Sequence, residues 1–415
     1  MPKTGPPIIA PSKSRGEGAG DKDNRHIVFS TNRLHLRNVM VLKAGFHKQT
    51  FQFGFNARTS RSVMKDRTSW FIKIWDYANP EIFGLGECGP LPGLSVEEIP
   101  KMDEVLELTV GRIMHGQLAL PTFSGSPADN LQSLNTALKE YFSDFFLQQN
   151  PSVRFALETA LLDLGQGGTR TIFDNSFIRG QPITINGLVW MGGLDFMLQQ
   201  AEIKIRDGYR CIKLKVGGMD FEKECDILQY IRRKYFREKI VIRLDANGAF
   251  KLEDALYKLK QLSRFEVHSI EQPIKVGSPG LPELCKTSPI PIALDEELIS
   301  VVTRDEKEKL LERIKPPYIV LKPTLHGGLF GCQEWIELAE ASQVGWWITS
   351  ALESNVGLNA ISQFAACYPI TIPQGLGTGE IYTNNIPSPL KVDKGQLSYD
   401  SAGNWDLSEF GERLE

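Results

Sequence analysis

Six charged residues in the second half of the chain lie where apolar segments of strand length end. They are three lysines and three acidic residues, in the order Lys213, Lys215, Asp245, Glu271, Asp295 and Lys322. After Lys215 one such residue follows roughly every 24 to 30 residues, about the length of one strand and one helix. In a closed parallel barrel the C-terminal ends of the strands converge on one mouth. We therefore predict that the six side chains share one pocket, as in an active site.

The three acidic residues indicate a metal site. Carboxylates on rigid strands suit a hard divalent cation, and three of them leave coordination positions for substrate oxygens and water, as Mg²⁺ prefers. Zinc is disfavoured because no His or Cys accompanies them. We predict that Asp245, Glu271 and Asp295 bind Mg²⁺, with Mn²⁺ as a substitute, and we prefer Asp295 over the neighbouring Glu296 and Glu297.

Each of these residues alone has an ordinary structural interpretation. A Lys-x-Lys pair is usually the solvated face of an edge strand, and an acid after a strand is often a helix cap or turn former, as Asp245 could be. However, apolar residues flank and separate Lys213 and Lys215, so the period of two directs both lysines into the barrel. Repetition on five neighbouring strands makes a purely structural role a poor account of the whole set.

The alternation of side chains along a strand predicts where two further residues point. Arg243 shares the parity of Asp245, so it either reaches the pocket to bind a substrate carboxylate or pairs with a neighbouring acid. His268 has the opposite parity to Glu271 and points toward the helix layer. We therefore assign His268 a structural role.

The elements that must position these residues alternate between short apolar runs and amphipathic helical stretches, which is typical of βαβ units. The predicted strands are 183–190, 211–216, 240–245, 267–271, 290–295, 318–322 and 346–350, with a short apolar piece at 373–376. This pattern predicts an α/β fold, a (β/α)7β barrel or modified TIM barrel. A doubly wound sheet is the rival, but no Gly-rich phosphate loop follows the first strand.

The first part of the chain predicts a different architecture. Residues 1–25 are rich in Pro, Gly, Ser and charge and are predicted to be a disordered tail; a transit peptide is disfavoured by their acidic residues. Residues 26–180 predict an α+β capping domain, with strands to about residue 75, a polar connection at 56–69, and helices beginning at Ser95, Ser126 and Ser152. The barrel is assigned to 181–390, and 391–415 to a segment that packs on cap or barrel.

Composition restricts the possible partners. The chain has 47 basic and 50 acidic residues, for a net charge of −3, and no basic tract interleaved with aromatics, so nucleic acid is not expected. No apolar run approaches the ~20 residues of a membrane span. The six scattered cysteines predict reduced thiols and a cytoplasmic protein. A small-molecule carboxylate is the expected ligand, and monomer and homo-oligomer both stay open.

The strand-end motifs together resemble the enolase superfamily, over nearly the whole chain from about residue 30. They are Ile212-Lys213-Leu214-Lys215, Leu244-Asp245-Ala246-Asn247-Gly248, Ile270-Glu271-Gln272-Pro273, Ala293-Leu294-Asp295-Glu296 and Leu321-Lys322-Pro323. Lysines on both the second and sixth strands resemble the muconate cycloisomerase subgroup. The segment 349–357 is similar to that of the o-succinylbenzoate synthase family. The region 375–380 lacks the Asp-x-Asp of dipeptide epimerases.

The resemblance implies a lyase, a magnesium-dependent syn dehydration of 2-succinyl-6-hydroxy-2,4-cyclohexadiene-1-carboxylate to o-succinylbenzoate in menaquinone or phylloquinone biosynthesis. Lys215 would be the base, Lys322 would stabilise the enediolate intermediate, and Lys213 would orient the carboxylate. The implied substrate contacts are Asn247, Ser350, Gly377 and Thr378, each of which has a turn or cap role as its alternative.

Two alternative functions stay open. One is an N-succinylamino acid racemase, or another lysine-dependent epimerase or cycloisomerase of the same superfamily, which would use Lys215 and Lys322 as opposed bases. The other is a barrel that has lost catalysis and serves for binding, although burying six charged groups would cost such a scaffold desolvation energy. For an enzyme, the loops 56–69 and 89–95 are expected to close over the mouth.

Overall fold

The computed structural model describes residues 40–58 and 63–410. The predicted disordered tail, residues 1–25, lies outside the described residues. None of the described helices is both long enough and apolar enough to cross a membrane.

The cap begins with a three-stranded antiparallel sheet in the order β1 (Leu42–Arg58), β2 (Val63–Asp76) and β3 (Asn79–Cys88). The predicted polar connection at 56–69 is therefore wrong, because β1 runs to Arg58 and β2 resumes at Val63. Ala57 pairs with Met64 in the ladder. Exposed polar side chains such as those of Arg58, Lys65 and Asp66 are compatible with a strand that has one solvated face, so their polarity did not indicate a loop.

Four α-helices complete the cap: α1 (Met102–His115), α2 (Pro127–Phe142), α3 (Asp144–Gln149) and α4 (Pro151–Gly165). The start of α2 after Ser126 is confirmed, and Ser126 and Asp129 form a capping box there. The helix predicted from Ser95 begins only at Met102. A 3-10 turn, η1 (Ile99–Lys101), precedes it and holds Pro100 near its start.

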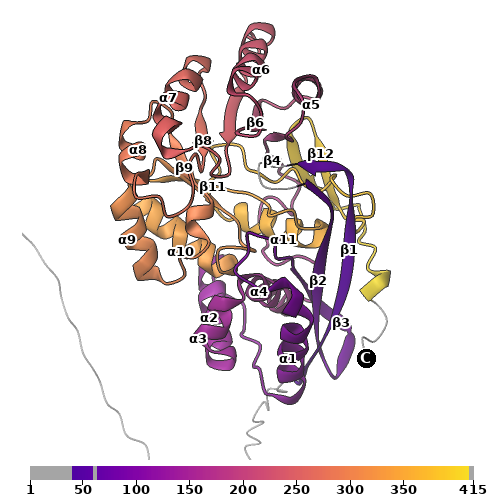
Figure 1. Cartoon of the computed structure of the whole chain (residues 1–415). Coiled ribbons are helices and arrows are strands. Elements are labelled where there is room, and N and C mark those ends of the chain that lie inside the picture. Colours follow the sequence, from indigo (N-terminus) through magenta and orange to yellow (C-terminus); the bar gives the residue numbers. More distant parts are fainter. Residues whose placement is uncertain (1–39, 59–62, 411–415) are drawn as a thin grey trace, which may run out of the picture. The chain divides into compact units, whose positions relative to one another are not determined.

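The second part of the chain is a parallel sheet whose strands alternate with helices (Figure 1). Its strands are β5 (Gly187–Val189), β6 (Cys211–Lys215), β7 (Val241–Asp245), β8 (Ser269–Glu271), β9 (Ile292–Leu294), β10 (Tyr318–Leu321) and β11 (Gly345–Ile348). The helices are α5 (Leu194–Arg206), α6 (Phe221–Lys234), α7 (Leu252–Leu262), α8 (Leu281–Thr287), α9 (Arg304–Ile314), α10 (Gly328–Ala341) and α11 (Asn355–Ala365), with 3-10 turns η2 (Ser263–Phe265) and η3 (Glu296–Leu298). Sequence order equals spatial order, as a barrel requires.

The barrel closes through a short irregular segment instead of a full eighth strand. Gly375 bridges Thr349 after β11, and Gln374 bridges Ile185 on the other side. The predicted (β/α)7β barrel is thereby confirmed. The predicted first strand, 183–190, is split: β4 (Ile183–Thr184) pairs with β13 (Gln396–Tyr399), which also pairs with β12 (Leu390–Asp393). The domain boundaries themselves stay predictions.

Helix α4 is buried along almost its whole length and connects the cap with the barrel. Two glycines of β3 allow the close approach on the cap side, because a Cβ added at Gly84 or Gly86 would lie 1.8 or 1.9 Å from a carbonyl oxygen of α4. On the barrel side, Glu158 of α4 accepts hydrogen bonds from the backbone of Leu329 and Phe330 at the start of α10. The last described element, the 3-10 turn η4 (Ser408–Phe410), returns to the cap and places Phe410 against Phe71 of β2.

Candidate active site

The register of three neighbouring strands aligns three of the six predicted residues. Lys215 of β6 pairs with Asp245 of β7, and Asp245 pairs with Glu271 of β8. Residues in register on a parallel sheet point to the same face. Asp295 directly follows β9, and Lys322 directly follows β10. All of these positions lie at the C-terminal ends of the barrel strands.

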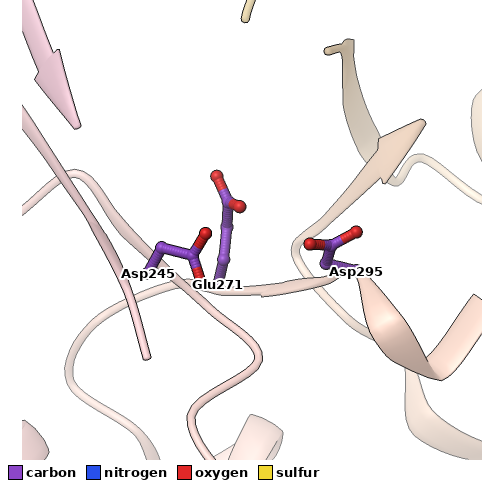
Figure 2. A group of neighbouring side chains, drawn as sticks. All are labelled: Asp245, Glu271 and Asp295. Atoms are coloured by element: carbon purple, nitrogen blue, oxygen red, sulfur yellow. The ribbon is translucent and has the colours of Figure 1, made fainter. Parts of the chain in front are cut away.

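The three carboxylates converge on one space (Figure 2). One oxygen from each of Asp245, Glu271 and Asp295 lies within 4.8 Å of the others, and all three residues are buried. Oε1 of Glu271 is buried without a hydrogen-bond partner. Three hard oxygen ligands, one of them otherwise unsatisfied, fit a divalent cation.

Three ammonium groups surround these carboxylates. Nζ of Lys213 contacts the carboxylate of Glu271 and lies 3.0 Å from Asp245. Nζ of Lys215 lies 2.7 Å from the same Asp245 carboxylate, and Nζ of Lys322 lies 2.5 and 2.6 Å from the two oxygens of Asp295. Three ammonium groups and three carboxyl groups therefore share one mostly buried site.

Burial and charge act in opposite directions on the acids. Burial raises the pKa of the Asp245 carboxyl, but Lys213 and Lys215 outweigh it and hold that pKa well below its usual range. Burial also raises the pKa of Asp295, but the ammonium group of Lys322 outweighs it, so this pKa is lowered. For Glu271, burial together with repulsion from the other two carboxylates outweighs Lys213 and raises the pKa to about 7.

The pKa of two of the lysines moves upward. Burial alone would lower the pKa of Lys213, but the carboxylates of Asp245, Glu271 and Asp295 outweigh it, so the pKa is raised. The pKa of Lys322 is also raised, because its pairing with Asp295 outweighs burial. Both side chains are therefore protonated and positively charged at neutral pH in this arrangement.

A cavity of about 390 Å³ opens over this cluster. Its polar side contains Lys213, Lys215, Asp245 and Lys322. Its apolar side is contributed by both cap and barrel, and includes Phe55, Met64, Leu91, Leu94, Leu188, Trp190 and Ile381. An apolar wall facing a few charged groups is typical of a site for a small organic acid.

Four of the five predicted substrate contacts line this cavity: Asn247, Ser350, Gly377 and Thr378. Asn247 also holds one of the lysines, since its Oδ1 accepts a hydrogen bond of 3.0 Å from Lys215. Its Nδ2 donates to Glu296 at 2.9 Å. Glu296, next to the predicted metal ligand Asp295, thus orients the amide that contacts Lys215.

Arg243 does not line the cavity, and the expectation that it reaches the pocket or pairs with an acid is corrected. It is fully buried inside the barrel, with its guanidinium carbon 4.1 Å from the ring centroid of Trp347. Its Nη1 donates to the carbonyl of Pro373 at 2.8 Å. Arg243 does point into the barrel, as its parity with Asp245 predicts. Parity does not say how deep a side chain lies, and here the ring of Trp347 on β11 holds the guanidinium below the pocket.

His268 lies outside the cavity lining and is half-buried beside the ring of Tyr318. No pattern in the sequence predicted the apolar wall contributed by Phe55 and Trp190. Leu91 and Leu94 of the loop 89–95 are in the wall, and the closure of this loop over the mouth stays a prediction. Part of the other expected loop, residues 59–62, lies outside the described residues.

Comparisons with known proteins agree with this geometry. Residues 197–403 match the family model described as enolase C-terminal domain-like. An o-succinylbenzoate synthase from Desulfotalea psychrophila is 42% identical over 366 residues, which are 86% of this chain and 98% of that protein. The chain belongs to the enolase superfamily, in the o-succinylbenzoate synthase family.

Solved structures support the same assignment. The crystal structure of MenC from Desulfotalea psychrophila matches with a TM-score of 0.77 and 39% identity, over 86% of this chain and 99% of that one. A dipeptide epimerase from Cytophaga hutchinsonii, solved with Mg and the dipeptide D-Ala-L-Val, matches with a TM-score of 0.70 at 19% identity, over 89% and 96%. At that identity the likeness shows the fold alone.

Proposed function

We propose that this chain converts 2-succinyl-6-hydroxy-2,4-cyclohexadiene-1-carboxylate to o-succinylbenzoate, as a magnesium-dependent carbon–oxygen lyase of menaquinone or phylloquinone biosynthesis, with Lys215 as its base. One observation carries the proposal: Lys215 and Lys322 lie at the two ends of the arc of strands that bears the carboxylate triad, beneath a cavity with an apolar wall. The six free cysteines support a cytoplasmic location.

Asp245, Glu271 and Asp295 are the residues that would hold Mg²⁺, with Mn²⁺ as a substitute. The clustering of their oxygens and the unsatisfied Oε1 of Glu271 support this choice. The dipeptide epimerase from Cytophaga hutchinsonii, which shares the fold, was solved with Mg, and we propose the same ion for this chain. When bound, the cation supplies positive charge beside the substrate carboxylate, where negative charge develops during proton removal.

Lys215 acts first as base and then as acid. Its amine takes the proton on the ring carbon that bears the carboxylate, and Asn247 holds its nitrogen by a hydrogen bond of 3.0 Å. The ring electrons then expel the hydroxyl group, which leaves as water with the proton from Lys215. The hydrogen and the hydroxyl depart from the same face because one lysine serves both steps. Aromatisation of the ring supplies the driving force.

The other two lysines do not move protons in this proposal. Lys322 approaches from the far end of the arc and stabilises the negative intermediate as a cation. Lys213 is buried between Glu271 and Asp245, and its role in this proposal is to orient the carboxylate group of the substrate. The raised pKa of both groups is consistent with permanent positive charges.

A racemase of N-succinylamino acids is the second candidate, because Lys215 and Lys322 also provide a base at each end of the site. Solvent deuterium separates the two functions. A racemase exchanges the α-proton of an N-succinylamino acid with solvent, whereas a synthase alone shows little exchange.

Turnover of the cyclohexadiene substrate, followed by ultraviolet absorbance, tests the proposal. The wild type with Mg²⁺ is compared with EDTA-treated enzyme, with Lys215→Ala, and with Lys234→Ala, which removes a half-exposed lysine of α6 paired with Glu202. We expect formation of o-succinylbenzoate that is lost with EDTA and with Lys215→Ala and retained with Lys234→Ala. No turnover by a folded wild type that binds Mg²⁺ would contradict the proposal and favour the racemase.

A further inference from the structure

Glu353 lies directly behind the part of the cavity wall formed by Ser350, Ala351 and Leu352. Its side chain is fully buried and does not line the cavity. Within residues 40–58 and 63–410, no lysine or arginine forms an ion pair with it. A buried carboxylate without a cation needs hydrogen-bond donors to remain stable.

Two hydroxyl groups from different loops provide those donors. Thr324, in the loop after β10 and two residues beyond Lys322, donates to Oε1 of Glu353. Ser350, in the loop after β11, donates to Oε2. The carboxylate therefore connects the loops that follow the sixth and seventh barrel strands.

A third loop joins through Ser350. The hydroxyl of Thr378, in the segment after the irregular eighth strand, donates to Oγ of Ser350 at 2.8 Å. The backbone N–H groups of Leu352 and Glu353 also donate to that oxygen, at 2.9 and 3.2 Å. Ser350 has one hydroxyl proton, and Glu353 accepts it.

The Ser350 hydroxyl is thus fully engaged inside the protein and has no proton to donate to a substrate. What Ser350 and Thr378 offer the cavity is a fixed surface, whose position depends on the carboxylate behind it. We propose that Glu353 is a positioning residue that joins the loops after the sixth, seventh and eighth barrel strands into one rigid wall of the substrate site. This inference rests on the proposed function in naming the bound molecule.

The exchange Glu353→Gln tests it with little change in shape. Thr324 and Ser350 donate to different oxygens of the carboxylate, and an amide replaces one of these oxygens with an NH₂ group, so one of the two hydroxyls loses its acceptor. We expect KM for the cyclohexadiene substrate to rise at least tenfold. Mg²⁺ affinity, measured by titration calorimetry, should stay within twofold, because the triad is not touched. Glu158→Gln neutralises an equally buried carboxylate away from the cavity and is the matched control.

A double-mutant cycle with Ser350→Ala separates positioning from a general structural effect. If Glu353 acts through Ser350, the double variant is no worse than the worse single variant. Multiplied effects, or an unchanged KM in folded Glu353→Gln, would overturn the proposal. If Glu353→Gln does not fold, Thr324→Val removes one of the two donors and should raise KM in the same direction, while Thr324→Ser, which keeps the hydroxyl, should not.

Amide hydrogen exchange tests the wall independently of catalysis. In Glu353→Gln, peptides that contain Ser350 and Thr378 should exchange at least tenfold faster, whereas peptides of α6 should not change. An inactive wild type would contradict the proposed function alone, and this exchange pattern would still decide the role of Glu353. Unchanged exchange in both segments would overturn that role.

Discussion

Glu87 of the cap accepts two hydrogen bonds from Ser354 of the barrel, from the backbone nitrogen at 2.9 Å and from the hydroxyl at 2.6 Å. Gly357 N–H and the hydroxyl of Ser69 also donate to this carboxylate, at 3.0 and 2.8 Å. Glu87 is the last residue but one of β3, two residues before the loop 89–95, and Ser354 is the N-cap of α11. The strand end that leads into the loop 89–95 is therefore fixed to the start of α11, next to the cavity wall.

Replacement of Glu87 by alanine should loosen this connection. The variant leaves buried donors of Ser69, Ser354 and Gly357 without an acceptor, and we expect the free energy of unfolding to fall by about 2 kcal/mol or more. Urea unfolding followed by circular dichroism measures it. Glu81→Ala changes an exposed glutamate on the same strand and should have little effect. Equal effects of the two exchanges would contradict the assigned connection.

Asp295→Asn should remove metal binding. An amide keeps the size of the ligand but loses the charge that attracts a divalent cation, so we expect Mg²⁺ affinity to fall by more than about 100-fold, beyond the usual effect of residues that only support ligands. Titration calorimetry measures the affinity. Asp305→Asn, on the exposed start of α9, is the control and should bind as the wild type does. Retained affinity in Asp295→Asn would remove this residue from the ligand set.

His326 should make stability depend on pH below neutrality. Burial lowers the pKa of this imidazole to about 3, while its Nδ1 lies 3.0 Å from the backbone nitrogen of Lys322 and accepts its proton. Below its unfolded pKa of about 6.5, the unfolded chain takes up a proton that the folded chain does not. Stability is therefore lost as pH falls from about 6.5 toward 3, by about 2 kcal/mol between pH 6.5 and 4.5.

His326→Asn keeps an acceptor for Lys322 but does not titrate in this range. Urea unfolding of both proteins at pH 6.5 and 4.5 should show a smaller loss of stability for the variant. Other groups titrate equally in both proteins, so the difference belongs to His326. Parallel losses would show that the imidazole does not control this pH dependence.

Leu94→Ala should weaken substrate binding through the apolar wall. Leu94 is partly buried against Leu91 and Ala351 at the cavity, and loss of its apolar contact with the substrate should raise KM about tenfold, equivalent to about 1.4 kcal/mol. Steady-state kinetics should show little change in kcat, because this contact binds substrate and transition state alike. Val96→Ala, an exposed residue just beyond the loop, is the control. A loss confined to kcat would instead assign the loop to the chemical step.

The barrel and the charged cluster could be predicted from the amino-acid pattern. Parallel strands alternate side chains with a period of two, and their ends converge, so the positions of Lys215, Asp245 and Glu271 follow from local pattern alone. The helix start at Ser126 is equally local, because its capping box lies within four residues. The irregular eighth strand was also indicated by the sequence, as the short apolar segment 373–376.

Features that depend on contacts between distant segments could not be predicted in this way. Arg243 has the parity of a pocket residue, but Trp347 of another strand holds it below the pocket. Ser350 looks like a free hydroxyl in the sequence, yet Glu353 and Thr378 engage it completely. These outcomes depend on depth and on hydrogen-bond partners brought together by the closed barrel, and a one-dimensional pattern specifies neither.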